Sequence, residues 1–286
     1  MTKHNLRNAL DSNTFVCAPG IQDMITAVIA NKVGFDFVYA SGYWSAASAF
    51  GLPDAGLVSF TQMQDRVATL AQTCNAGVIA DADTGYGGLL NVDHTVRGFE
   101  EAGAVGIQLE DQEFPKKCGH TKGKRVISKS DMVQKVKVAC AARQNPDTII
   151  IARTDAKQPE DYESAIERAI AYGEAGADMV FVEALETEAE MRDACARIKT
   201  PMMANMFAGG KTPVLPANTL KDIGYSVAIF PAATSLAAAA AAETALFNLK
   251  TSGTSLSPEV PLFSFSEFNE LIGFPRVWAF DEKWAK

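Results

Sequence analysis

The amino-acid sequence predicts a (β/α)8 TIM barrel, an α/β fold in which eight parallel strands alternate with helices. The first indication is a weak repeat, in which a helix-like segment ends at a glycine and an apolar run follows. The repeat occupies residues 33–39, 102–107, 175–181 and 223–229. Four further apolar runs of strand length lie at residues 14–17, 77–80, 148–152 and 201–204. The intervals between the eight runs are long enough for helices, which predicts alternating β and α units.

Each element of the repeat has a physical reason. A glycine closes the helix because it adopts the left-handed conformation that ends many helices. The apolar run that follows has the composition of a parallel strand that is buried on both faces. A doubly wound open sheet is the alternative, but no glycine-rich dinucleotide fingerprint follows the first strand. We therefore expect a single barrel domain over residues 1–286, with a C-terminal helical extension from about residue 240.

Composition limits the class of protein. The five cysteines are odd in number, widely spaced and without a CxxC pair, which disfavours disulfides and a zinc site and suits the reducing cytoplasm. The N-terminus lacks the apolar core of a signal peptide, and the longest apolar stretch, residues 236–242, is too short to cross a bilayer. A net charge of −8 without a basic stripe disfavours nucleic acid and membrane surfaces as partners.

Polar residues lie at the carboxyl ends of the predicted strands, where barrels of this kind hold their active sites. From the second strand onward these residues are Tyr39, Ser41, Asp81, Asp83, Glu110, Arg153, Glu183 and Asn205. Turn formation alone does not account for carboxylate, guanidinium, amide and phenol groups at so many strand ends. We expect these side chains to converge on one rim of the barrel.

The pair Asp81 and Asp83 predicts a metal site. Residues two apart on a strand point to the same side, so the two carboxylates would repel one another unless a cation lay between them. Oxygen ligands without histidine or cysteine suit Mg²⁺ or, as a second choice, Mn²⁺. Glu110 at the next strand end would bind the metal directly or through water. The alternative is that one aspartate caps the following helix and the other is exposed.

The pentapeptide Lys116-Lys117-Cys118-Gly119-His120 combines groups that move protons near neutral pH. Cations beside a cysteine favour its thiolate, and a histidine two residues away can relay the proton. The surrounding segment 113–124 carries glycines and several lysines, so we expect a solvated lid that is mobile without substrate. The alternative is an ordinary surface loop with an incidental cysteine.

Seven motifs resemble the isocitrate lyase and phosphoenolpyruvate mutase superfamily, and they follow in order through nearly the whole chain. They are YASG (39–42), GLPD (51–54), DADTGYG (81–87), EDQ (110–112), KKCGH (116–120), ARTD (152–155) and FVEA (181–184). The resemblance implies a barrel whose eighth helix is exchanged between paired subunits, commonly in a homotetramer built as a dimer of dimers. It also implies Mg²⁺ as the cofactor and a small 2-oxo or 2-hydroxy dicarboxylate as the substrate.

The same resemblance implies roles for individual residues. Catalytic roles fall to Cys118, Lys116, His120, Arg153, Glu183 and Tyr39. Substrate binding falls to Tyr39, Ser41, Gly42, Asp81, Gly119, His120, Arg153, Glu183 and Asn205. The metal site comprises Asp54, Asp81, Asp83 and Glu110, in direct contact or through water. A base removes the 2-hydroxyl proton, the bond between carbons 2 and 3 breaks, and Cys118 protonates the resulting carbanion.

The cysteine signature favours a carbon–carbon lyase, because the phosphonate mutases and hydrolases of the superfamily lack it. The turn at 209–213 and the tail at 270–274 resemble the branch that holds 2,3-dimethylmalate lyase and the petal death protein. An apolar wall near Ala208 and Leu236 would fit an alkylmalate better than a tricarboxylate. Release of pyruvate and a short carboxylic acid from a 2,3-dimethylmalate-like substrate is the first expectation. Methylisocitrate lyase and an oxaloacetate-type acetylhydrolase or decarboxylase are alternatives, and a phosphonate mutase is a more distant one.

Overall fold

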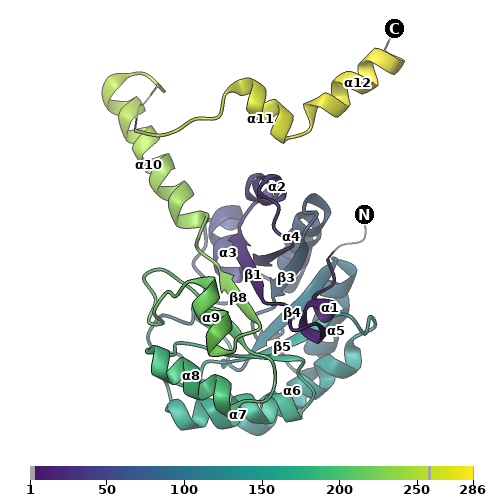
Figure 1. The fold of residues 1–286 in the computed structure, drawn as a ribbon, viewed down its shortest axis with the longest axis vertical. Coiled ribbons are helices and arrows are strands. Elements are labelled where there is room, and N and C mark those ends of the chain that lie inside the picture. The colour runs from purple at the N-terminus through teal and green to yellow at the C-terminus, as the bar shows by residue number, and fades with distance from the viewer. Residues whose placement is uncertain (1–3, 257–258, 286) are drawn as a thin grey trace.

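The computed structural model describes residues 4–256 and 259–285, and it contains all eight predicted strands in one parallel sheet (Figure 1). The strands are β1 (Val16–Ile21), β2 (Phe37–Ala40), β3 (Gly77–Asp81), β4 (Ala104–Glu110), β5 (Ile149–Thr154), β6 (Met179–Val182), β7 (Met203–Asn205) and β8 (Val227–Phe230). The first strand differs from its prediction, since it begins at Val16 and continues to Ile21. It accommodates Pro19 and Gly20 because the backbone of Pro231 packs where a side chain at Gly20 would lie.

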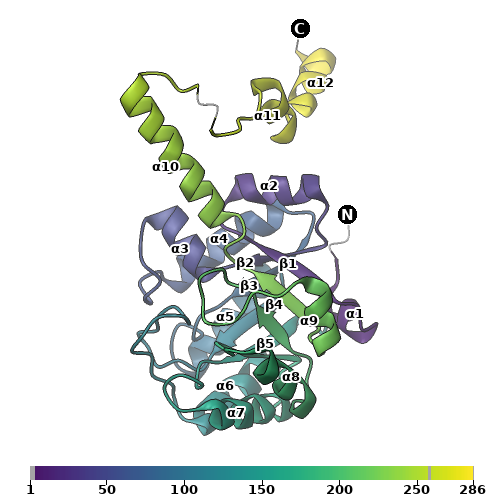
Figure 2. The same cartoon turned by 60° about the vertical axis from the view of Figure 1, so that its left-hand side comes forward.

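The sheet closes on itself and is not an open doubly wound sheet. Its strand order is β6-β5-β4-β3-β2-β1-β8-β7, so strands that follow one another along the chain are neighbours. A parallel bridge between Val180 and Met202 joins the two ends of that order. Figure 2 shows the strands β1 to β5 inside the surrounding helices. The closed sheet brings the carboxyl ends of all strands to one face, as the fold class predicts.

Helices alternate with the strands and cover the outside of the barrel. They are α1 (Leu6–Asp11), α2 (Met24–Val33), α3 (Gly42–Phe50), α4 (Phe60–Thr73), α5 (Leu89–Glu101), α6 (Lys129–Ala142), α7 (Tyr162–Glu174), α8 (Glu188–Arg197) and α9 (Ala217–Ile223). Several begin at side chains that accept a hydrogen bond from the first turn, as Asp23, Ser59 and Asp161 do. Apolar side chains such as Ile79, Ile151 and Phe181 fill the barrel interior, which leaves only its carboxyl-end face open for a site.

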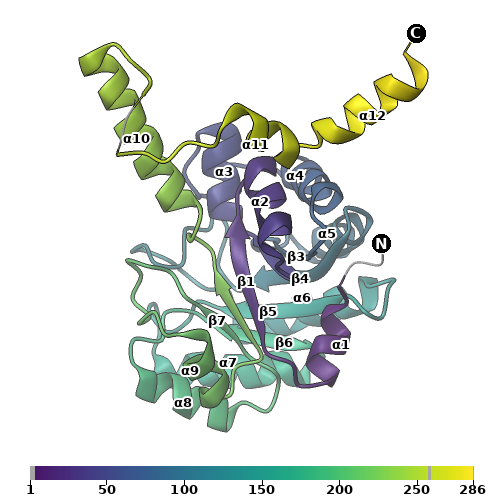
Figure 3. The same ribbon diagram turned by 45° about the horizontal axis from the view of Figure 1, so that its top comes forward.

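Three C-terminal helices leave the barrel: α10 (Ser235–Ser252), α11 (Phe265–Leu271) and α12 (Phe274–Trp284) (Figure 3). Within α10 only Ser235 is buried, so this helix does not pack on its own barrel. Lys32 of α2 lies over the ring of Phe263, 5.3 Å from its centre, just before α11. The extension therefore begins at Ser235, earlier than the predicted residue 240, because all of α10 points away from the barrel. In the described part of the chain, no helix combines the length and apolar character needed to span a membrane.

Candidate active site

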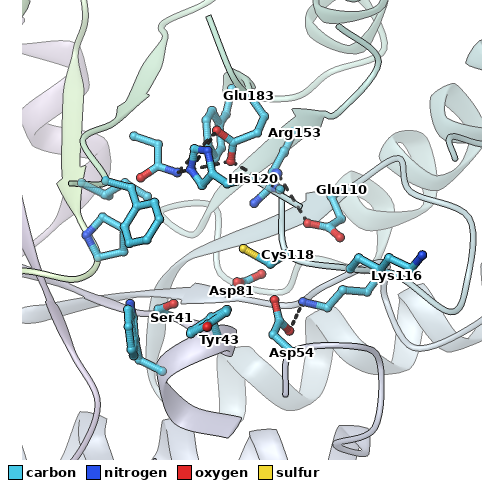
Figure 4. Close-up of a pocket in the computed structure, with 18 of the residues that line it drawn as sticks. Ser41, Tyr43, Asp54, Asp81, Glu110, Lys116, Cys118, His120, Arg153 and Glu183 are labelled. Atoms are coloured by element: carbon cyan, nitrogen blue, oxygen red, sulfur yellow. Dashed lines mark hydrogen bonds and ion pairs between the residues drawn. The ribbon is translucent and has the colours of Figure 1, made fainter. Parts of the chain in front are cut away.

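A cavity of about 190 Å³ opens at the carboxyl ends of the strands. Its wall includes nearly all the predicted site residues, namely Tyr39, Ser41, Asp54, Asp81, Glu110, Lys116, Cys118, Gly119, His120, Arg153, Glu183 and Asn205. Figure 4 shows the Cys118 thiol between two groups of side chains, one formed by Asp54 and Asp81 and the other by Arg153 and Glu183. The expected convergence of strand ends is therefore observed.

Gly42 and Asp83 are the two predicted site residues that lie behind this wall. The Gly42 N–H donates to Asp81 Oδ2 over 3.1 Å, so it orients a wall residue. Asp83 follows β3 in a turn with a φ of 49°, and its N–H donates to Asp81 Oδ1 over 3.1 Å. The prediction that Asp81 and Asp83 alternate along one strand is wrong, because β3 ends at Asp81.

The Lys116 ammonium lies among the carboxylates. It hydrogen-bonds Asp54 Oδ1 and stands 2.6 Å from Asp83 Oδ1, and its side chain is 4% exposed. Burial alone would lower the pKa of Lys116, but the surrounding carboxylates, Asp83 and Glu110 foremost, raise it well above its ordinary value. The expectation of a solvated lysine at this position is wrong, because Lys116 is a buried, charged partner of the acids.

Four carboxylates, those of Asp54, Asp81, Asp83 and Glu110, surround the single ammonium of Lys116. Burial raises the pKa of Asp83 to about 7, although Lys116 opposes the shift, and burial also raises the pKa of Glu110 well above its ordinary value. Glu110 Oε1 is buried and has no hydrogen-bond partner in the described part of the chain. An unpaired carboxylate oxygen beside further oxygen donors fits a hard divalent cation.

The acids of the cavity do not form a compact set of metal ligands. Asp54, Asp81 and Glu110 face the cavity, whereas Lys116 holds Asp83 back. Among residues 4–256 and 259–285, no three His, Cys, Asp or Glu side chains converge closely enough to hold a metal ion. Mg²⁺ usually retains several waters, which matches such a loose set of carboxylates.

Arg153 is held by carboxylates through two of its three side-chain nitrogens. Its Nε and Nη2 each donate to Asp155 over 2.9 Å, and its Nη2 lies 3.2 Å from Glu183 Oε2. The guanidinium also lies over the ring of Phe181, 5.2 Å from its centre. Removing one partner of a buried ion pair costs about 3–5 kcal/mol, against about 0–1 kcal/mol for an exposed pair. Arg153 is therefore fixed rigidly in the wall.

Cys118 and His120 are in their neutral forms near pH 7. Burial raises the pKa of the Cys118 thiol, and burial lowers the pKa of His120. The prediction that neighbouring lysines favour the Cys118 thiolate is wrong, because desolvation outweighs the cations. His120 stacks on Phe207 with ring centres 5.0 Å apart, and its Nε2 lies 3.4 Å from the Asn205 amide nitrogen. A thiol that is protonated near pH 7 can act as a proton donor.

Sequence reasoning missed the apolar part of the wall. It consists of Tyr43, Trp44, Phe207, Ile229 and Pro231. Tyr43 and Trp44 directly follow Ser41-Gly42, so their position after a strand end was an available signal. The expected apolar residues Ala208 and Leu236 do not line the cavity, because Ala208 is exposed in a turn and Leu236 lies on α10.

Comparison with known proteins assigns the family. The family model described as phosphoenolpyruvate phosphomutase matches residues 6–249. The chain belongs to this family. It is 42% identical to 2,3-dimethylmalate lyase of Eubacterium barkeri, over 99% of the chain and 98% of that protein. It is 41% identical to 2-methylisocitrate lyase of Aeropyrum pernix (94% and 86% covered) and 38% identical to petal death protein of Dianthus caryophyllus (98% and 89%).

Solved structures agree with this assignment. The fold of this chain matches an oxaloacetate acetylhydrolase in complex with 3,3-difluorooxalacetate. The TM-score is 0.93, at 31% identity over 98% of this chain and 96% of that one. It matches 2,3-dimethylmalate lyase with a TM-score of 0.92, at 32% identity over 100% and 96%. A phosphonopyruvate hydrolase in complex with oxalate and Mg²⁺ has a TM-score of 0.88, at 28% identity over all of both chains. The chain is an enzyme, a lyase of this superfamily.

Proposed function

We propose that the protein is a Mg²⁺-dependent carbon–carbon lyase that cleaves a substituted malate to pyruvate and a short carboxylic acid. The observation that carries this proposal is the half-buried Cys118 thiol, which faces a cavity with acids on one side and an apolar wall on the other. The name and near-complete match of the dimethylmalate lyase relative support the same substrate class.

In this proposal the chain's own residues bind, orient and protonate the substrate. Tyr39, Ser41 and Asp81 contact the part of the substrate that becomes the 2-oxo acid. A base of the cavity takes the 2-hydroxyl proton, the oxygen on carbon 2 becomes a carbonyl as the bond between carbons 2 and 3 breaks, and the electron pair of that bond remains on carbon 3. The Cys118 thiol then gives its proton to carbon 3, which suits a thiol whose pKa burial raises. Arg153 and Glu183 form an ion pair. This pair stabilises the charge that develops around carbon 3 and orients that part of the substrate.

The remaining predicted roles belong to the same proposal. Gly119 and His120 border the substrate on the Cys118 side, Asn205 orients His120, and Gly42 acts through Asp81. Asp54, Asp81 and Glu110 would hold the metal directly or through water, with Asp83 and Lys116 behind them. When bound, Mg²⁺ supplies positive charge beside the substrate's carboxylate and 2-oxygen.

Two cations of the cavity are already paired with the protein's own acids, and part of the wall is apolar. Lys116 is paired with Asp54 and Asp83, and Arg153 is paired with Asp155 and Glu183. His120 is neutral because burial lowers its pKa. Trp44, Phe207 and Pro231 offer surface for an alkyl group, which supports an alkylmalate as the substrate.

A panel of malate derivatives, assayed with Mg²⁺ for release of pyruvate, tests the substrate. We expect turnover to be highest with 2,3-dialkylmalates and to produce no acetate. Hydrolysis of an oxaloacetate-like diacid is the second candidate, supported by the similarity to oxaloacetate acetylhydrolase. Acetate release from oxaloacetate would favour that candidate, and a preference for methylisocitrate would favour the tricarboxylate lyases.

Removal of the metal tests the cofactor. We expect a chelator to abolish turnover and added Mg²⁺ to restore it, with Mn²⁺ as a partial substitute, because Asp54, Asp81 and Glu110 line the cavity together and oxygen ligands suit these cations. Mg²⁺ should also raise the melting temperature of the chelated protein, since a ligand that binds only the native state stabilises it. Full activity of thoroughly chelated protein would refute the metal assignment.

We also propose that the protein works in the cytoplasm as a homotetramer whose paired subunits exchange α10. Support comes from α10, which buries only Ser235 on its own barrel. The exposed apolar side chains of α10 and α12, Phe247 and Trp278 among them, would be covered by a second copy.

A further inference from the structure

The segment that carries Cys118 ends at a buried lysine that the proposed mechanism does not use. Lys124 follows the exposed residues Lys122 and Gly123, yet its side chain is 1% exposed. Its ammonium donates to the Gly119 carbonyl and, over 2.9 Å, to Asp155 Oδ1. Burying a charge costs free energy unless the charge is paired. The Lys124 ammonium has lost its hydration, so these two partners must stabilise its charge.

The two partners of Lys124 are connected to the working groups of the site. Gly119 directly follows Cys118, and the two carboxylate oxygens of Asp155 also bind Arg153. A Cβ at Gly119 would overlap Arg153 Nη2 and lie 2.8 Å from Glu183 Oε2, so the Gly119 peptide is in close contact with both. Lys124 therefore fastens this peptide against the Arg153–Glu183 pair.

The near end of the same segment has a separate anchor. Gln112 accepts from the Lys117 N–H over 3.0 Å and donates to the Lys117 carbonyl over 2.8 Å. Between the two anchors, Thr121 closes a local turn by donating to the Cys118 carbonyl through its N–H and its hydroxyl, over 3.0 and 2.8 Å. That turn keeps the segment compact but does not join it to the barrel. The two ends of the segment are also paired with one another, since the Glu113 N–H donates to the Arg125 carbonyl over 2.8 Å and a bridge joins Gln112 to Val126. The Gly119 peptide itself is held by Lys124.

We propose that Lys124 is a positioning residue, whose buried ammonium latches the Cys118–Gly119 peptide onto the Asp155–Arg153 pair. The latch sets the separation between the thiol and the guanidinium, and it shields the thiol from solvent. Its effect on turnover rests on the proposed lyase function. Its effect on the exposure of Cys118 does not.

The test is the substitution Lys124→Met, which keeps the length of the side chain and removes its charge and donors. We expect kcat to fall on the order of 10²-fold with little change in KM, because small displacements of reacting groups carry losses of this size. Without substrate, alkylation of Cys118 by iodoacetamide should accelerate about tenfold or more, since the segment opens more often. Peptide mapping separates Cys118 from the other cysteines, whose alkylation rates serve as internal standards.

Lys122→Met is the matched control, because Lys122 is an exposed lysine of the same segment. It should leave kcat, KM and the alkylation rate of Cys118 unchanged. Wild-type alkylation and turnover in folded Lys124→Met protein would overturn the latch. If that variant does not fold, Lys124→Gln retains a neutral donor but loses the ion pair with Asp155, so alkylation of Cys118 should still accelerate. A wild-type alkylation rate in Lys124→Gln would overturn the proposal that the ammonium latches the peptide onto the Asp155–Arg153 pair. A protein without lyase activity would still show the alkylation difference, so failure of the proposed function is distinguishable from failure of the latch.

Discussion

At the scale of single residues, the proposed reaction depends on Cys118 as a protonated thiol. Serine is nearly the size of cysteine but is a far poorer proton donor, so Cys118→Ser should lower turnover on the order of 10²-fold or more, the usual contribution of a general acid. The melting temperature should stay unchanged. Turnover of the purified variant and a thermal melt measure the two quantities. Wild-type turnover in the serine variant would assign the proton donor to another group.

The protonation state of the same thiol gives a pH prediction. Burial raises the pKa of Cys118 above its ordinary value of 9.0. An acid catalyst must be protonated. A raised pKa therefore extends to higher pH the range in which Cys118 is protonated. Turnover that depends on this proton is lost only as pH rises beyond the raised pKa. Alkylation needs the thiolate and should therefore accelerate over the same alkaline range. An alkylation midpoint near neutral pH, measured at Cys118 by peptide mapping, would contradict the assignment.

The identities of the site residues were predictable from sequence, but their electrostatics were not. Parallel strands of a barrel end on one face, so Asp81, Glu110 and Arg153 could be grouped from their places after apolar runs. Desolvation depends on packing by residues distant in sequence. Neighbouring lysines therefore gave the wrong direction for the pKa of Cys118, and nothing local distinguished buried Lys116 and Lys124 from exposed Lys122.

At the scale of elements, the segment between β4 and α6 approaches the barrel closely at Gly119, where there is no room for a side chain. A Cβ at Gly119 would overlap the Arg153 guanidinium, so Gly119→Ala should displace either the segment or Arg153. We expect turnover to fall on the order of 10²-fold, as for other small misplacements of reacting groups. Gly88→Ala is the matched control, because a Cβ at Gly88 meets nothing within 4 Å and its φ is −81°. Steady-state kinetics of the two variants test the difference, and equal activities would show that the segment adapts without cost.

Element boundaries were harder to predict than element types. Apolar runs predicted every strand, because a strand covered on both faces requires them. The prediction ended β1 too early, since Pro19 and Gly20 normally interrupt strands, and only the approach of Pro231 explains the glycine. The turn at Asp83 was missed because its φ of 49° is uncommon for a residue other than glycine, and only the contacts with Lys116 and Asp81 show why it is tolerated.

At the scale of the whole molecule, residues 4–256 and 259–285 supply no eighth helix that covers the barrel. The strand β1 leaves Cys17 exposed on its outer face, and α10 points away from the barrel (Figure 1). On α10, Leu246 and Phe247 are 66% and 65% exposed. Large exposed apolar side chains on a helix that buries almost nothing are typical of an interface. In the assembly proposed above, exchange of α10 with a second copy would cover both the helix and the uncovered strand with one contact.

This arrangement predicts that assembly depends on α10. The double substitution Leu246→Glu and Phe247→Glu should dissociate the protein, because each charge would have to be buried without a partner in the interface. Sedimentation velocity should show a tetramer for the unmodified chain and smaller species for the variant. Cys17 should be alkylated faster in the dissociated form, which links the uncovered strand to the same contact. Lys250→Glu, an exposed charge reversal in the last turn of α10, is the control and should leave assembly intact. A tetramer that survives the double substitution, with Cys17 still accessible, would show that the subunits associate through another surface.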